Sequence, residues 1–152
     1  MIDFNFFFSK ETFLISACKF GRIELVKLLL QQPETNVNIY DDKGNTPLIH
    51  AVSQGHFSIV RLLCEEKEDK INLNQNNFFK RTAFTFAAST NRIDILKYIA
   101  SRKEFNPNKS QACTAAAAAI IFGYKNIIEF LLSEKSDFNF DVNKEIEFNH
   151  FF

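Results

Sequence analysis

The residues with the most potential for chemistry are three cysteines and three histidines. Cys18, Cys64 and Cys113 are far apart in the sequence and form no C-x-x-C pair, which disfavours a disulfide framework or a zinc site. Scattered cysteines without such a pattern are typical of a reducing compartment, so a cytoplasmic location is expected. Cys113 paired with a neighbouring histidine is the one combination that leaves an enzymatic role open.

The motifs of common enzymes are absent from the sequence. It contains no H-E-x-x-H zinc motif, no G-x-S-x-G nucleophile turn, and neither of the glycine-rich patterns that hold phosphates or dinucleotides. Carboxylate pairs such as Glu65-Glu66 fit the solvated end of a helix better than an acid–base site. We therefore expect no catalytic residues, no metal and no cofactor.

Composition narrows the fold and the partners. The 152 residues suffice for one domain with a sizeable core. Four glycines and three prolines are few for a β-sandwich or barrel, which favours helices. With 18 basic and 18 acidic residues the net charge is zero, which argues against binding to nucleic acid or to anionic membranes. The longest apolar run, residues 115–122, is far shorter than the roughly 18 residues that span a bilayer.

The elements that must position these side chains come from an internal repeat. Thr12, Thr46, Thr82 and Thr114 are spaced by 34, 36 and 32 residues. An alanine follows each threonine by five residues, and a glycine or asparagine follows it by nine. The alanines are Ala17, Ala51, Ala87 and Ala119, and the later positions are Gly21, Gly55, Asn91 and Gly123.

Each unit is predicted to be a pair of helices. The threonine hydroxyl would cap a short first helix, the alanine would allow a neighbouring helix to approach closely, and the glycine or asparagine would end the helix. Apolar residues 13, 14, 17 and 18 positions after each threonine then form one face of a second helix. An Asx-x-Asn segment, such as Asn36-Val37-Asn38, would turn the chain toward the next unit. Such pairs bury their apolar faces only by stacking.

The second unit resembles the ankyrin repeat. It carries Asp41, Gly44, Thr46-Pro47-Leu48, Ala51 and Gly55-His56, at the spacing of the D-x-x-G-x-T-P-L-H-x-A-A-x-x-G-H pattern. The resemblance covers about residues 8–141. It implies an all-α solenoid of helix-turn-helix units with short β-hairpin-like fingers. The expected repeats are 8–40, 41–76, 77–108 and 109–141, with a tail at 142–152.

Some positions depart from the family pattern. Ile49 stands where the family has a histidine, and His50 follows it. The third unit lacks the finger glycine, and the fourth keeps Thr114 and Ala119 but loses the proline and leucine between them. His56 fills the Gly-His position and is expected to be structural. The alanine run 115–119 is expected to pack between neighbouring helices, with the floor of a binding groove as the alternative.

The resemblance also implies a binding surface: a concave face of finger tips and exposed positions of the first helices, here called the finger face. The predicted partner-binding residues are Phe20, Asp41, Asp42, Lys43, Ser53, Gln54, Phe78, Phe79, Phe86, Thr90, Gln111 and Phe122. The five phenylalanines stand out because exposed aromatic rings are enriched at interface hot spots. The alternative is that the fingers fold these rings inward.

We therefore expect a non-catalytic module that binds a protein partner through the finger face, without a cofactor. A regulatory inhibitor that occludes an enzyme such as a kinase is the alternative within the same family. Self-association remains open as well, because the fourth unit is apolar and the first eight residues contain Phe4, Phe6, Phe7 and Phe8. These tails could instead fold back as caps.

Overall fold

The computed structural model describes residues 13–67, 70–106 and 108–133, with the side chain of Lys109 excepted. Within these ranges the chain forms eight helices in four helix-turn-helix pairs. Their bounds are α1 Phe13–Lys19, α2 Ile23–Leu30, α3 Pro47–Gln54, α4 Phe57–Glu66, α5 Ala83–Ser89, α6 Ile93–Ala100, α7 Lys109–Ile121 and α8 Lys125–Leu132. The predicted all-α repeat solenoid is confirmed.

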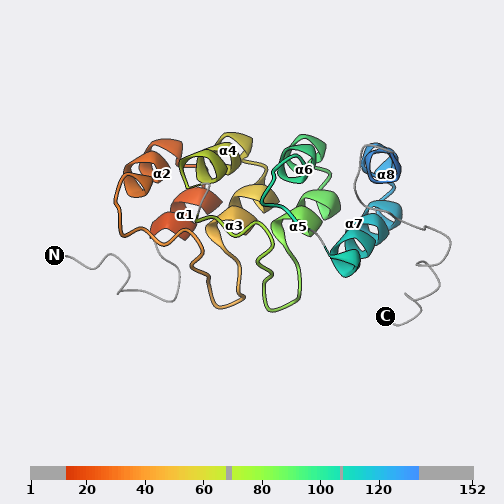
Figure 1. The fold of residues 1–152 in the computed structure, drawn as a ribbon, viewed down its shortest axis with the longest axis horizontal. Coiled ribbons are helices and arrows are strands. Elements are labelled where there is room, and N and C mark those ends of the chain that lie inside the picture. The colour runs from red at the N-terminus through yellow and green to blue at the C-terminus, as the bar shows by residue number, and fades with distance from the viewer. Residues whose placement is uncertain (1–12, 68–69, 107, 134–152) are drawn as a thin grey trace.

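The helices form two rows (Figure 1). The first helices α1, α3, α5 and α7 make one row, and α2, α4, α6 and α8 make the other. Two long loops, one before α3 and one before α5, extend away from the second row. The Phe-rich start, Thr12, His150 and the tail 142–152 lie outside the described residues.

Threonine caps the first helix in the second and third units, as predicted. The Thr46 side chain accepts a hydrogen bond from the Ile49 amide at 3.2 Å, and Pro47 occupies the first turn, where its missing N–H costs nothing. Thr82 and Thr85 form a reciprocal capping box at the start of α5.

The prediction that Thr114 caps a short helix is wrong. Helix α7 begins earlier, because the Asn108 side chain accepts from the Gln111 amide at 2.9 Å while the Gln111 side chain accepts from the Asn108 amide at 3.2 Å. Thr114 lies inside the helix, where its hydroxyl donates to the Ser110 carbonyl at 2.8 Å. The segment between Asn108 and Thr114 therefore forms the first turns of α7 instead of a finger.

The predicted ends of the first helices are confirmed. Gly21, Gly55 and Gly123 have φ of 70°, 76° and 71°, and Asn91 has φ of 56° at the equivalent position. Asparagine tolerates the left-handed conformation better than most residues, which explains its use where glycine is missing.

The core lies between the two rows of helices. All four predicted alanines are buried, with at most 2% of their surface exposed, and first helices of adjacent units pack directly on one another. The alanine run of α7 lies against α5, as expected for close packing rather than an open groove, with Ala115 and Ala119 fully buried. On α2, however, Leu25 and Leu28 are exposed, because α2 has a second-row neighbour on one side only among the described helices.

The Asx-x-Asn segments turn the chain and also join the units. Asn36 and Asn72 each accept the amide of the residue two positions later, at 2.9 and 3.0 Å. The Asn38 side chain accepts from the Asn72 amide at 2.8 Å, and the Asn74 side chain accepts from the Asn106 amide at 3.2 Å. The same spacing in sequence therefore produces a ladder of hydrogen bonds between consecutive loops.

Candidate functional site

The first finger, residues 41–45, is a tight turn organised by one carboxylate. Asp41 Oδ1 accepts the amides of Lys43 and Asn45, at 2.9 and 2.8 Å, and the Asp41 amide donates to the Asn45 carbonyl at 3.1 Å. Gly44 provides the left-handed residue that closes the turn, with φ of 78°. Gly44 also lies against the backbone of Phe78, so a side chain there would clash with the next finger.

The second finger, residues 77–81, repeats this turn with different residues. Asn77 Oδ1 accepts the amides of Phe79 and Arg81, at 3.0 and 2.9 Å, in the way that Asp41 does in the first finger. Lys80 stands in the position of Gly44 and has φ of 60°. The missing finger glycine therefore leaves the turn unchanged and places a lysine in a strained backbone conformation.

The two fingers are hydrogen-bonded to each other. The Asn77 side-chain amide donates to Asn45 Oδ1 at 2.8 Å, and the Phe78 amide donates to the Lys43 carbonyl at 3.1 Å. The Phe78 and Tyr40 rings also form a T-shaped pair, with 5.8 Å between ring centroids. These contacts fix the finger tips relative to one another before any partner binds.

A hollow of about 360 Å³ lies between the first finger, the ends of α1 and α3, and α5. Lys19 and His50 contribute to its wall, and so do six of the predicted residues. These six are Asp41, Asp42, Lys43, Ser53, Gln54 and Phe86. The fold thus brings together residues from three repeat units, at the positions that the repeat pattern assigned to one face.

Asp41 in this hollow is held within the chain. His50 Nε2 lies 2.8 Å from Asp41 Oδ2. Partial burial pushes the pKa of Asp41 upward, but hydrogen bonds from the Asn45 amide, the His50 ring and the Lys43 amide outweigh it, so the net pKa is lowered. Both carboxylate oxygens of Asp41 therefore support the finger, and Asp42 is the exposed carboxylate beside them.

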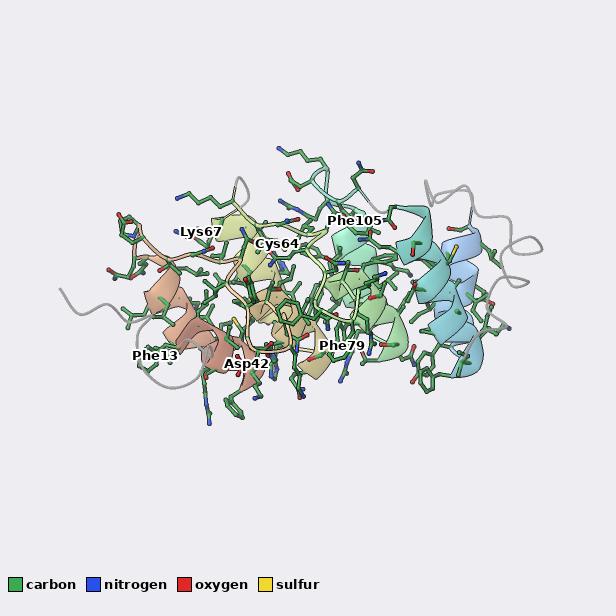
Figure 2. All side chains as sticks on the ribbon, turned by 90° about the horizontal axis from the view of Figure 1, so that it is seen from below. Phe13, Asp42, Cys64, Lys67, Phe79 and Phe105 are labelled. Atoms are coloured by element: carbon green, nitrogen blue, oxygen red, sulfur yellow. The ribbon has the colours of Figure 1, made fainter. Side chains whose placement is uncertain are left out.

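Most of the predicted aromatic residues are exposed. The exposed fractions are 63% for Phe20, 63% for Phe78, 69% for Phe79 and 58% for Phe122, which rules out inward folding of these four rings. Phe86 is partly buried, and the Arg81 guanidinium lies 3.9 Å from the centre of its ring. In Figure 2, Asp42 and Phe79 lie toward one edge of the molecule, and Cys64, Lys67 and Phe105 lie toward the opposite edge.

The other six predicted residues do not line the hollow: the exposed Phe20, Phe78 and Phe79, and also Thr90, Phe122 and Gln111. Thr90, which follows α5, donates its hydroxyl to the Phe86 carbonyl at 2.8 Å. Phe122 follows the last turn of α7 and stacks on Tyr124, with 5.7 Å between centroids. Gln111 was predicted at a finger tip, but it forms part of the cap in the first turn of α7, because the fourth unit has no finger turn there.

Sequence reasoning missed Asn45, Ile49 and Arg81 as residues of this face. Asn45 and Ile49 line the hollow, and Arg81 covers the Phe86 ring while donating to the Ser89 hydroxyl. Asn45 and Arg81 both stand one position before a cap threonine. This shared position in the repeat is the sequence signal that could have identified Asn45 and Arg81 as residues of the finger face.

The groups considered for catalysis have structural surroundings. Burial raises the pKa of Cys18 and of Cys64 to about 12, so both thiols are neutral core side chains. His50 bonds Asp41, and His56 Nε2 lies 3.2 Å from the Lys19 carbonyl; neither of these bonds involves Cys113 on α7. Among the described residues, no three His, Cys, Asp or Glu side chains gather as metal ligands, and no helix is long and apolar enough to cross a membrane.

The sequence was compared with models of known families. A family model described as ankyrin repeats (3 copies) matches residues 2–77 and 66–145, which together make up most of the chain. No curated protein matches the sequence.

Proposed function

The chain belongs to the ankyrin repeat family, and we propose that it binds a protein partner through the finger face. Ankyrin repeats are generally protein–protein interaction modules, and the family is generally non-catalytic. The scattered cysteines are consistent with a role in the cytoplasm, where thiols stay reduced.

The observation that carries this proposal is the pair Phe78 and Phe79 at the tip of the second finger. Both rings are more than half exposed, at 63% and 69%. Leaving a large apolar side chain in water forgoes roughly 1.5–3 kcal/mol that burial would supply. Two adjacent exposed rings on a rigid support are typical of the hot spots that dominate protein interfaces.

The rest of the face complements these rings. The hollow beside the first finger has polar walls that include Asp42, Lys43, Ser53 and Gln54, which suit a hydrogen-bonding rim around an apolar contact. Because Asn45 and Asn77 already join the fingers, little conformational entropy is lost when a partner docks there.

Affinity capture with the full chain as bait tests the proposal. Ser53→Trp fills the hollow, while Glu66→Trp adds the same bulk to the exposed end of α4. We expect quantitative mass spectrometry to show a partner that is retained by the wild-type and Glu66→Trp baits and lost from the Ser53→Trp bait. A partner retained equally by all three baits would contradict binding at this face. If the captured partner is an enzyme, assaying it with added chain separates simple docking from inhibition by occlusion.

A further inference from the structure

The outer side of the first unit exposes apolar positions that the later units bury. Leu25 on α2 is 41% exposed, whereas the isoleucines at the same position of the later units are at most 3% exposed. Phe13 and Leu28 are also exposed, and the residues that correspond to Phe13 in the later units are all buried. Because α1 and α2 lie at one end of the two rows, no described unit packs against this side (Figure 1).

Inside the solenoid, an asparagine of the preceding unit binds the loop that follows each second helix. The Asn38 side chain accepts from the Asn72 amide at 2.8 Å and donates to the Lys70 carbonyl at 2.6 Å. One unit later, the Asn74 side chain makes the two corresponding bonds, each at 3.2 Å. Every rung of the ladder therefore needs one backbone donor and one backbone acceptor, two residues apart.

The first unit has a rung of this kind with nothing bound to it. The corresponding groups are the Asn36 amide and the Glu34 carbonyl, which lie in the loop after α2. Within the described part of the chain, neither group has a hydrogen-bond partner. The first unit thus combines an uncovered apolar side with the donor and acceptor that an Asx-x-Asn segment binds in the later units.

The start of the sequence contains such a segment. Asp3-Phe4-Asn5 has the Asx-x-Asn pattern and ends seven residues before Thr12, whereas the segments ending at Asn38 and Asn74 stop eight residues before their threonines. In the second unit that connection includes a closed finger turn, in which the Asp41 amide donates to the Asn45 carbonyl. A connection one residue shorter therefore still has the length to reach. Residues 3–5 themselves lie outside the described part of the chain.

We propose that residues 3–5 dock on the outer side of the first unit as an additional rung of the ladder. The Asn5 side chain would accept the Asn36 amide and donate to the Glu34 carbonyl. The Asp3 carboxylate would accept the Asn5 amide, as the first residue of each inner segment accepts the amide two positions later.

Phe4 would cover part of the uncovered apolar side. The middle residues of the two inner segments, Val37 and Leu73, are buried in the core. Phe4 in the same position would lie toward Leu25 and Leu28. A larger side chain suits this place, because no further described unit shares in covering the end of the solenoid. Docking of this kind would reduce the apolar surface on which a second copy of the chain could stack.

An asparagine at such a position has a second possible role, since Asn108 caps α7 instead of joining the ladder. Two observations favour the ladder for Asn5. The cap on α7 is reciprocal, because the Gln111 side chain accepts the Asn108 amide, whereas Phe8, three residues after Asn5, has no side-chain acceptor. The first unit also presents a donor and an acceptor that only a ladder segment would use.

Amide hydrogen exchange of the full chain, followed by NMR at single residues, tests the proposal. We expect the Asn36 amide to be protected to about the same degree as the Asn72 amide. Asn5→Ala should speed exchange at Asn36 by about tenfold or more and leave Asn72 unchanged, because only the first rung is lost. The matched control Asn76→Ala, which removes another exposed asparagine side chain, should leave Asn36 unchanged.

A second pair of variants tests the apolar contact. Phe4→Ser should also speed exchange at Asn36 by about tenfold or more, because the ring holds the segment in place. Phe20→Ser removes an exposed ring at the other end of α1 and should have no effect on Asn36. Protection of Asn36 should be independent of protein concentration. Protection that rises with concentration would overturn the proposal, because a second copy would then be covering this side.

The wild-type chain alone can also contradict the proposal, whatever the variants do to folding. Rapid exchange at Asn36 beside a protected Asn72 would overturn it. Protection of the Phe8 amide that depends on Asn5, with Asn36 exchanging rapidly, would show that Asn5 caps a longer α1 in the way that Asn108 caps α7.

Discussion

The imidazole ring of His56 lies directly against Gly21, the residue that ends the first helix of the preceding unit. A Cβ atom added to Gly21 would lie 2.8 Å from this ring, and His56 Nε2 is 3.2 Å from the Lys19 carbonyl. Arg92 covers Gly55 in the same way one unit later. In the second and third units, the residue after the helix-ending glycine or asparagine thus contacts the unit before it.

Gly21→Ala should therefore destabilise the chain more than Gly123→Ala. Both glycines have positive φ, 70° and 71°, so both substitutions carry the same backbone strain of about 1 kcal/mol. Gly123 has no neighbouring atom within 4 Å of an added Cβ, whereas Gly21 meets the His56 ring. Denaturant unfolding measures the difference. Equal losses for the two variants would mean that the contact between His56 and Gly21 adds nothing to stability.

Asn77→Ala should separate the two fingers. Asn77 is buried; its side chain donates to Asn45 and accepts the amides of Phe79 and Arg81. Leaving these groups without partners should cost about 1–3 kcal/mol in the free energy of unfolding. Asn76→Ala, at the exposed neighbouring position, is the control and should cost little. A loss no greater than that of the control would show that the bond between the fingers contributes little.

Lys80→Gly should stabilise the chain. Lys80 has φ of 60° in the position that Gly44 fills in the first finger. Removing the strain of a side chain in the left-handed region should gain about 1 kcal/mol or less, because glycine also loses more entropy on folding. The check is the thermal midpoint, which should rise by a small amount. A lower midpoint would show that the Lys80 side chain contributes more than its backbone strain costs.

Ala51→Leu and Ala87→Leu should each destabilise the chain, because both alanines are fully buried between first helices. Overpacking of this kind costs typically 1–3 kcal/mol. Ser53→Leu adds the same kind of bulk toward the hollow and should cost little. If thermal unfolding shows that all three variants are tolerated equally, the assignment of the threonine-plus-five alanines to the helix contacts is wrong.

The repeat pattern predicted the parts of the fold that depend on local chemistry. Thr46 and Thr82 are caps, and Asn91 takes the place of a glycine, because each role is set by the residue type and its immediate neighbours. Thr114 was mispredicted because a competing cap at Asn108 starts the helix earlier. Spacing within a repeat carries no information about which of two available caps is used.

The candidate site could be predicted only in part. The exposure of Phe78 and Phe79 follows from their place at a finger tip. The hollow requires Lys19, His50 and Phe86, from three units, to lie side by side, and that depends on how the units stack. The hydrogen bond between Asn45 and Asn77 likewise depends on the spacing of adjacent units in three dimensions.

The measurement that tests the central claim most directly is the affinity of the captured partner for Phe78→Ser with Phe79→Ser, compared with Glu65→Ser and Glu66→Ser at the end of α4. Each ring that the partner buries should contribute about 1.5 kcal/mol or more to binding. Removing both rings should therefore raise the dissociation constant by about 100-fold or more. The glutamate pair should leave it unchanged, and both double variants should keep their helicity and thermal midpoint. Partner binding through the finger face would be contradicted if binding survived the phenylalanine changes but was lost with the glutamate pair. It would also be contradicted if the phenylalanine changes caused a large drop in the thermal midpoint.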